Sequence, residues 1–154
     1  MKFNCQWRGE FESAEVGLLH ADAFGSPVAA DVDVDTDVET ETDAEPERQT
    51  DWRTTVAAHS LGWVTARDEG ARLIGFVNVI WDGGAHAWIQ DVMVSPSSRN
   101  NGLGTGLVTA AREAATQAGC QWLHVDFEES LRPFYLDACG FAPTTAGLIR
   151  LESS

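Results

Sequence analysis

The amino-acid sequence predicts an α+β fold, arranged as one domain over residues 1–154. Two observations lead to this prediction. A chain of 154 residues has the length of a single domain that buries roughly two-thirds of its unfolded surface. Its local patterns run in the order strand, two helices, three strands, long helix, strand, short helix and strand, without an internal repeat.

The N-terminal patterns predict one strand and two short helices. Residues 1–11 are predicted to contain the first strand, and residues 13–24 a helix that Ser13 caps and that carries Val16, Leu19 and Ala23 on one face. A second helix is predicted over residues 51–60, with Asp51 as its N-cap.

An acidic segment separates these two helices. Ten acidic residues and Arg48 lie between residues 31 and 51 and contribute -9 to a net charge of -14. Like charges at every second position would repel on one face of a strand, so a disordered loop is predicted over residues 29–50. A calcium loop is the alternative, but Thr36 stands where such a loop needs glycine. No metal site is therefore expected.

The remaining patterns predict strands on either side of a long helix. Strands are predicted over residues 62–67, 73–81 and 87–94, joined by the Asp- and Gly-containing turns at residues 68–70 and 82–84. Apolar residues then recur at helical spacing from Leu103 to Ala118, and Gly119 ends the helix. Residues 122–127 predict a strand, and a short helix ending at Cys139-Gly140-Phe141 leads to the last one.

A glycine-rich turn, Arg99-Asn100-Asn101-Gly102-Leu103-Gly104-Thr105-Gly106, opens the long helix. Glycine lets a ligand approach the backbone closely, and the amides from residue 100 to 106 are expected to be unpaired at a helix start, where a pyrophosphate binds well. Two common phosphate motifs do not fit: no lysine follows Gly104 or Gly106, and Leu107 stands where the dinucleotide motif needs its third glycine.

The turn resembles the pyrophosphate loop of the GNAT family of acetyl-CoA-dependent N-acyltransferases. That loop follows a strand ending in Val-x-Pro and reads Gln/Arg-x-x-Gly-x-Gly/Ala; here Val94-Ser95-Pro96, Arg99, Gly102 and Gly104 fill every position. The closing Gly140-Phe141 is also similar, so the resemblance covers roughly residues 60 to 151.

The resemblance implies a mixed, mostly antiparallel sheet with helices on both faces. In such proteins the fourth and fifth strands splay apart and admit the pantetheine arm of acetyl-CoA. The implied reaction is direct transfer of an acetyl group to a primary amine of a small molecule or to an exposed amino group. The implied coenzyme-binding residues are Val92, Met93, Val94, Arg99, Asn100, Asn101, Gly102, Leu103, Gly104, Thr105 and Gly106.

The resemblance also suggests catalytic residues. The main-chain amide of Val92 corresponds to the oxyanion donor. Tyr135, the only tyrosine, corresponds to the general acid, although its spacing to Gly140-Phe141 is one residue longer than in the family and a packed core tyrosine would fit as well. Trp88 stands where some relatives carry a glutamate base.

Other side chains are candidates for the acceptor side. Asp91 is expected to face away from Val92 and either to anchor the acceptor ammonium or to make a sheet-edge contact. Asp126, followed by Glu128 and Glu129, is a candidate proton relay through water. His124 is a weaker candidate. Four tryptophans either line an acceptor pocket or pack in the core: Trp52, Trp63, Trp81 and Trp88.

Composition limits the partners and the setting. A net charge of -14 with a single lysine excludes nucleic acid as a ligand. An acidic, lysine-poor composition is typical of salt-accumulating organisms. The three cysteines lack the spacing of a disulfide framework or a zinc site, and the absence of a long apolar run predicts a cytoplasmic protein without membrane contact. A homodimer is compatible with the sequence.

Two other functions remain open. A non-catalytic acyl-CoA-binding module would keep the glycine turn and lose the acid and the base. A salt-adapted binding protein with an unrelated glycine turn would have no affinity for the coenzyme.

Overall fold

The computed structural model describes residues 2–24 and 51–152. Five strands form one sheet in sequence order: β1 (Phe3–Trp7), β2 (Ser60–Asp68), β3 (Leu73–Trp81), β4 (His86–Val94) and β5 (Trp122–Val125). The first four are antiparallel neighbours, and β5 runs parallel to β4. The predicted α+β fold with a mixed, mostly antiparallel sheet is confirmed. The predicted acidic loop lies outside the described residues.

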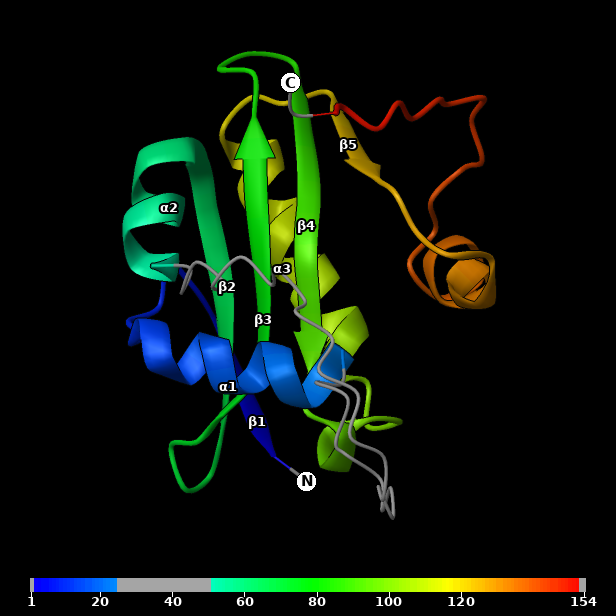
Figure 1. The fold of residues 1–154 in the computed structure, drawn as a ribbon. Coiled ribbons are helices and arrows are strands. Elements are labelled where there is room, and N and C mark those ends of the chain that lie inside the picture. The colour runs from blue at the N-terminus through cyan, green and yellow to red at the C-terminus, as the bar shows by residue number, and fades with distance from the viewer. Residues whose placement is uncertain (1, 25–50, 153–154) are drawn as a thin grey trace, which may run out of the picture.

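Helices cover both faces of the sheet (Figure 1). Helices α1 (Ser13–Phe24) and α2 (Trp52–His59) lie on one face, and α3 (Leu103–Gln117) lies on the other. Each face has its own apolar core. The α1 side buries Phe11, Val16, Leu19, Val56, Leu73, Phe76 and Met93. The α3 side buries a larger set that includes Leu103, Leu107, Val108, Ala111 and Ala115.

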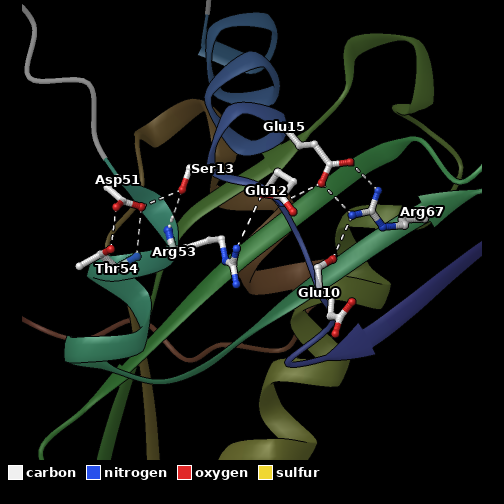
Figure 2. A network of polar contacts seen from close by, with 8 residues as sticks. All are labelled: Glu10, Glu12, Ser13, Glu15, Asp51, Arg53, Thr54 and Arg67. Carbon is white, nitrogen blue, oxygen red and sulfur yellow. Dashed lines mark hydrogen bonds and ion pairs between the residues drawn. The ribbon is translucent and has the colours of Figure 1, made fainter.

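Polar contacts fix α1 and α2 to each other (Figure 2). Asp51 caps α2 as predicted, accepting from the Thr54 amide at 3.2 Å. The prediction that Ser13 caps α1 is wrong. Glu12 precedes α1, and the carboxylate of Glu15, in the first turn, accepts from the Glu12 amide at 2.9 Å. The Ser13 hydroxyl donates to Asp51 and accepts from the Arg53 amide, which joins the two helices.

A forked ion pair ties α1 to β2. Arg67 donates from Nη1 and Nη2 to the two oxygens of Glu15 at 2.8 and 2.9 Å, and also donates to the carbonyls of Glu10 and Ala71. These bonds lower the pKa of Glu15 to about 2. The N-terminal end of α1 is thereby fixed over β2, and its C-terminal end lies near β4.

The C-terminal part differs most from the prediction. A short 3-10 turn, η2 (Glu129–Leu131), leads into a π-helical segment, η3 (Pro133–Ala138). The predicted last strand is wrong: residues 141–152 have no regular structure, and Leu148, Ile149 and Leu151 are 92%, 84% and 88% exposed. A strand needs a hydrogen-bonded partner, and none of the described strands lies along this segment.

Candidate functional site

Strands β4 and β5, at one edge of the described sheet, separate partway along β4. They pair from His86↔Trp122 to Ile89↔Val125. Beyond that pair, residues 90–94 of β4 have no partner strand on this side within the described part of the chain. Main-chain amides and carbonyls that a neighbouring strand would occupy are therefore free to bind an extended ligand. This is the splay that the resemblance implied.

A β-bulge lies at the same place on β4. Phe76 pairs with Met93 and Asn78 with Gln90, so Asp91 and Val92 together face the single residue Val77. Asp91 takes up the bulge with φ of 55°, a conformation that costs a residue with a side chain about 1 kcal/mol or more.

The bulge sets the direction of the side chains that follow it. Val92 and Val94 pack on the α3 side, whereas Met93 is buried on the α1 side. Asp91 also faces the α1 side, where Asn78 and the α1 residue His20 act on its pKa. The expected opposite orientation of Asp91 and Val92 is confirmed.

The glycine turn directly follows β4 and a 3-10 turn, η1 (Pro96–Ser98). Asn100 and Gly102 have positive φ, 65° and 76°, and Gly102 is the N-cap of α3. The first bond within the helix runs from the Gly106 amide to the Gly102 carbonyl at 3.0 Å. The amides of residues 103–105 therefore have no partner within the helix. The amide of Gly106, which was expected to be free, is already engaged.

The glycines of the turn serve different purposes. A Cβ on Gly102 would meet nothing within 4 Å, so this position needs glycine for its backbone angle and is open to a ligand. A Cβ on Gly104 would lie 3.1 Å from the ring of Phe134, and one on Gly106 3.4 Å from Phe3. The missing side chain of Gly104 therefore also allows Phe134 of η3 to pack against the turn. The sequence motif did not predict this contact.

The polar side chains of the glycine turn donate hydrogen bonds to main-chain carbonyls of the protein. Arg99 donates from Nη2 to the carbonyl of Ala23 at 2.9 Å, which ties the turn to the end of α1. Asn101 donates from its side-chain amide to the carbonyls of Ser98 and Arg99. These bonds hold the backbone in shape, so a ligand at this turn would be bound chiefly by main-chain amides.

Tyr135 lies in an aromatic cluster beside the turn. It is 5% exposed, and its ring lies 5.0 Å from Phe127 and 4.8 Å from Phe134 between centroids. Burial, followed by the nearby Cys139, raises the pKa of Tyr135 to about 12. The hydroxyl therefore keeps its proton at neutral pH, as a general acid must.

The unusual spacing after Tyr135 has a structural explanation. The amide of Cys139 donates to the carbonyl of Phe134 at 3.0 Å, five residues back, and η3 is therefore a π-turn. A π-turn takes in one residue more than an α-turn. The extra residue that the sequence carries between Tyr135 and Gly140-Phe141 is accommodated there.

Asp91 lies in a polar cluster that sequence reasoning did not anticipate. Burial raises the pKa of Asp91, while Asn78 and the charge of His20 act in the opposite direction. Asn78 is itself buried and bonded to the Ser60 hydroxyl. His20 lies against Phe24 and Trp52, with centroids 4.9 and 5.6 Å away. No local sequence signal links these residues, since β2, β3, β4 and both helices contribute to the cluster.

The other candidates lie apart from this cluster, except Trp52, which packs against His20. Asp126 and Glu128 are exposed after β5, and Glu129 pairs with Arg132 at 2.7 Å. Trp52 and Trp63 pack on the α1-side core, whereas Trp81 is 37% exposed. Trp88 stacks on His124, with centroids 4.8 Å apart.

Three further observations concern ligands and surroundings. A surface hollow of about 720 Å³ lies between the starts of α1 and α2, lined by Arg8, Arg53 and Trp63 among others, at the end of α1 away from the glycine turn.

Among residues 2–24 and 51–152, no three His, Cys, Asp or Glu side chains lie close enough together to bind a metal ion. No helix in this part of the chain has the length and apolar character needed to span a membrane.

Comparison with known proteins agrees with the geometry. A model of the acetyltransferase (GNAT) family matches residues 27–141. No curated protein sequence matches the chain.

Solved structures share the fold at low sequence identity. A GNAT-family acetyltransferase from Streptococcus pneumoniae aligns with a TM-score of 0.70 at 19% identity, covering 99% of this chain and 100% of the other. Glucosamine-6-phosphate N-acetyltransferase from Arabidopsis thaliana aligns with 0.67 at 15%, with the same coverage. AAC(6')-Iy, solved with the bisubstrate analogue CoA-S-monomethyl-acetylneamine, aligns with 0.70 at 14% over the whole of both chains.

Proposed function

The chain belongs to the acetyltransferase (GNAT) family, and on this premise we propose that it transfers the acetyl group of acetyl-CoA to a primary amine by direct attack in a ternary complex. The acceptor is an amine of a small molecule or an exposed amino group. The observation that carries the proposal is that two backbone sites with free hydrogen-bonding groups follow each other along the chain. After the unpaired segment of β4 at residues 90–94, the chain passes through η1 and the glycine turn to the free amides at the start of α3.

These two sites fit the two parts of the coenzyme. The amides of residues 103–105, at the positive end of the α3 dipole, suit the pyrophosphate. The main-chain groups of Val92 and Val94 suit the pantetheine amides. Bound there, the coenzyme supplies an acetyl thioester.

The chain's own residues then have three roles. The amide of Val92 donates to the carbonyl oxygen on which negative charge develops. Asp91 is proposed to anchor the acceptor ammonium, and the exposed Asp126 to relay a proton through water. As the N–C bond forms and the C–S bond breaks, Tyr135 gives its hydroxyl proton to the departing thiolate.

Coenzyme titration and an amine screen test this function. Calorimetry on the folded protein in high salt should show acetyl-CoA binding, and thiol release should follow on addition of an alkylamine, an arylalkylamine, an amino sugar or a peptide with a free amino terminus. Absence of coenzyme binding would refute the proposal. Binding without transfer to any of the amines would favour the alternative, an acyl-CoA-binding module without catalysis.

The setting and the assembly are further parts of the proposal. The net charge of -14 supports a place in the cytoplasm of a salt-accumulating organism. The exposed apolar side chains of Leu148, Ile149 and Leu151 support a homodimer that covers them. Sedimentation in molar salt, compared with a chain truncated after Ala146, tests the dimer.

A further inference from the structure

Three rings form a cluster on the sheet face that carries α1 and α2. His86 and Trp88 alternate along β4 with Ala87 and Ile89, whose side chains are buried on the α3 side. His124 alternates along β5 with Leu123 and Val125, which also pack on the α3 side. The rings of His86, Trp88 and His124 therefore share the face to which Asp91 points.

The two histidines are hydrogen-bonded to each other. His86 Nδ1 lies 2.7 Å from His124 Nε2, and each ring is half-buried. One nitrogen must donate and the other must accept, so at least one ring is neutral while the bond exists. The outer nitrogens, Nε2 of His86 and Nδ1 of His124, are left for other partners. Trp88 stacks on His124 with 19° between planes and holds the pair in place.

The pair extends from the splay toward the β3–β4 turn. His124 is in register with Trp88, one residue before the pairing of β4 and β5 ends at Ile89↔Val125. His86 lies two residues further from the splay. The histidine pair thus connects the opening between the strands with the surface at the turn.

Charged groups lie at both ends of the histidine pair. The carboxylate of Asp82, in the turn, accepts the His86 amide at 3.1 Å, and the charge of His86 helps to lower the pKa of Asp82. Cys120, before β5, is another titratable group on that side, and burial, followed by the charge of Asp82, raises its pKa. Asp91 and His20 lie toward the splay. The carboxylate of Asp82 therefore lies beside His86, at the end of the pair away from the splay.

We propose that His124 and His86 form a proton relay that deprotonates the acceptor amine. The acceptor is therefore an amine that carries a proton at neutral pH, such as an alkylamine. This inference rests on the proposed acetyl transfer. The ammonium N–H bond breaks and its proton passes to Nδ1 of His124. His124 passes the proton on Nε2 to Nδ1 of His86, and His86 releases one from Nε2 to water. The amine keeps the electron pair and attacks the thioester carbon. The second proton that the nitrogen loses as the amide forms restores, through water, the hydroxyl of Tyr135, whose own proton went to the thiolate.

The test compares two classes of acceptor in three variants. His124→Gln and His86→Gln remove the relay, and His59→Gln, an exposed residue at the end of α2, is the matched control. The relay predicts a loss of about 100-fold in kcat/KM for an alkylamine in both relay variants, with the acetyl-CoA KM unchanged. Hydroxylamine is already neutral at pH 7, so its acetylation should change less than threefold. Equal losses for both acceptors, or none for the alkylamine, would overturn the relay.

A second measurement does not depend on turnover. In a proton NMR titration of the histidine rings, a shared proton predicts that the two rings titrate together, and that His86→Gln weakens proton binding at His124. Independent titration of the two rings would overturn the relay, whatever the activity. A wild-type protein that does not bind acetyl-CoA would instead refute the proposed function, so the two failures are distinguishable.

Discussion

The backbone angle at Gly102 gives a direct way to separate stability from coenzyme binding. Gly102 begins α3 with φ of 76°, and a Cβ at this position would meet nothing within 4 Å. Gly119, just past the other end of the helix, has φ of 91° and equally open space. Alanine at either position meets the same strain, about 1–2 kcal/mol. The two substitutions should therefore lower the free energy of unfolding by similar amounts, measured by urea denaturation.

Only Gly102→Ala should affect the coenzyme. A shift of the backbone there moves the free amides of residues 103–105, and one lost bond from an amide to a charged phosphate is worth about 1.5–3 kcal/mol. This corresponds to a loss of roughly 10- to 150-fold in acetyl-CoA affinity by calorimetry. Gly119→Ala should bind as the wild type does. Equal affinities for the two variants would refute the assignment of the turn.

Three further substitutions test the ion pair and the catalytic side chains. The Arg67 guanidinium lowers the pKa of Glu15 from 4.5 to about 2, so the pair stabilises the fold above pH 4.5 and the effect is lost as the pH falls through 2. Because the Glu15 side chain is 35% exposed, Glu15→Gln should lower the free energy of unfolding by about 1 kcal/mol at pH 7, measured in urea, and by progressively less as the pH falls from 4.5 through 2. A difference independent of pH would contradict this. Tyr135→Phe should lower kcat about 10- to 100-fold with little change in KM, and an unchanged kcat and pH profile would exclude the acid role. Burial raises the pKa of Asp91, so its charged form destabilises the fold. Asp91→Asn should therefore raise the melting temperature at pH 7, and the KM for an alkylamine should rise roughly tenfold. An unchanged KM would show that Asp91 does not belong to the acceptor site.

The features that follow a local period could be predicted from the sequence. The bounds of α1 and β3 match the prediction, and α3 begins at the glycine turn, because capping residues, apolar periodicity and glycine act within a few residues of each other. The splay was anticipated only through the resemblance. Its cause is visible in the pairing of β4, which no local pattern encodes.

Features that depend on distant partners could not be predicted. The bulge at Asp91 places an ordinary aspartate at positive φ, and its environment comes from Asn78 and His20 on other elements. Ser13 has the residue type of an N-cap, yet it bonds to Asp51 and Arg53, 38 and 40 residues away. The π-turn at Tyr135 depends on a single bond, from the Cys139 amide to Phe134, that sequence spacing only hinted at.

Amide chemical shifts on addition of acetyl-CoA test the central claim most directly. The protein labelled with nitrogen-15 should show its largest shift changes at Val92, Val94 and residues 100–105, which trace the path from the open edge of β4 to the start of α3. Changes confined to the hollow around Arg8 and Arg53, or no changes with the protein folded, would contradict the account.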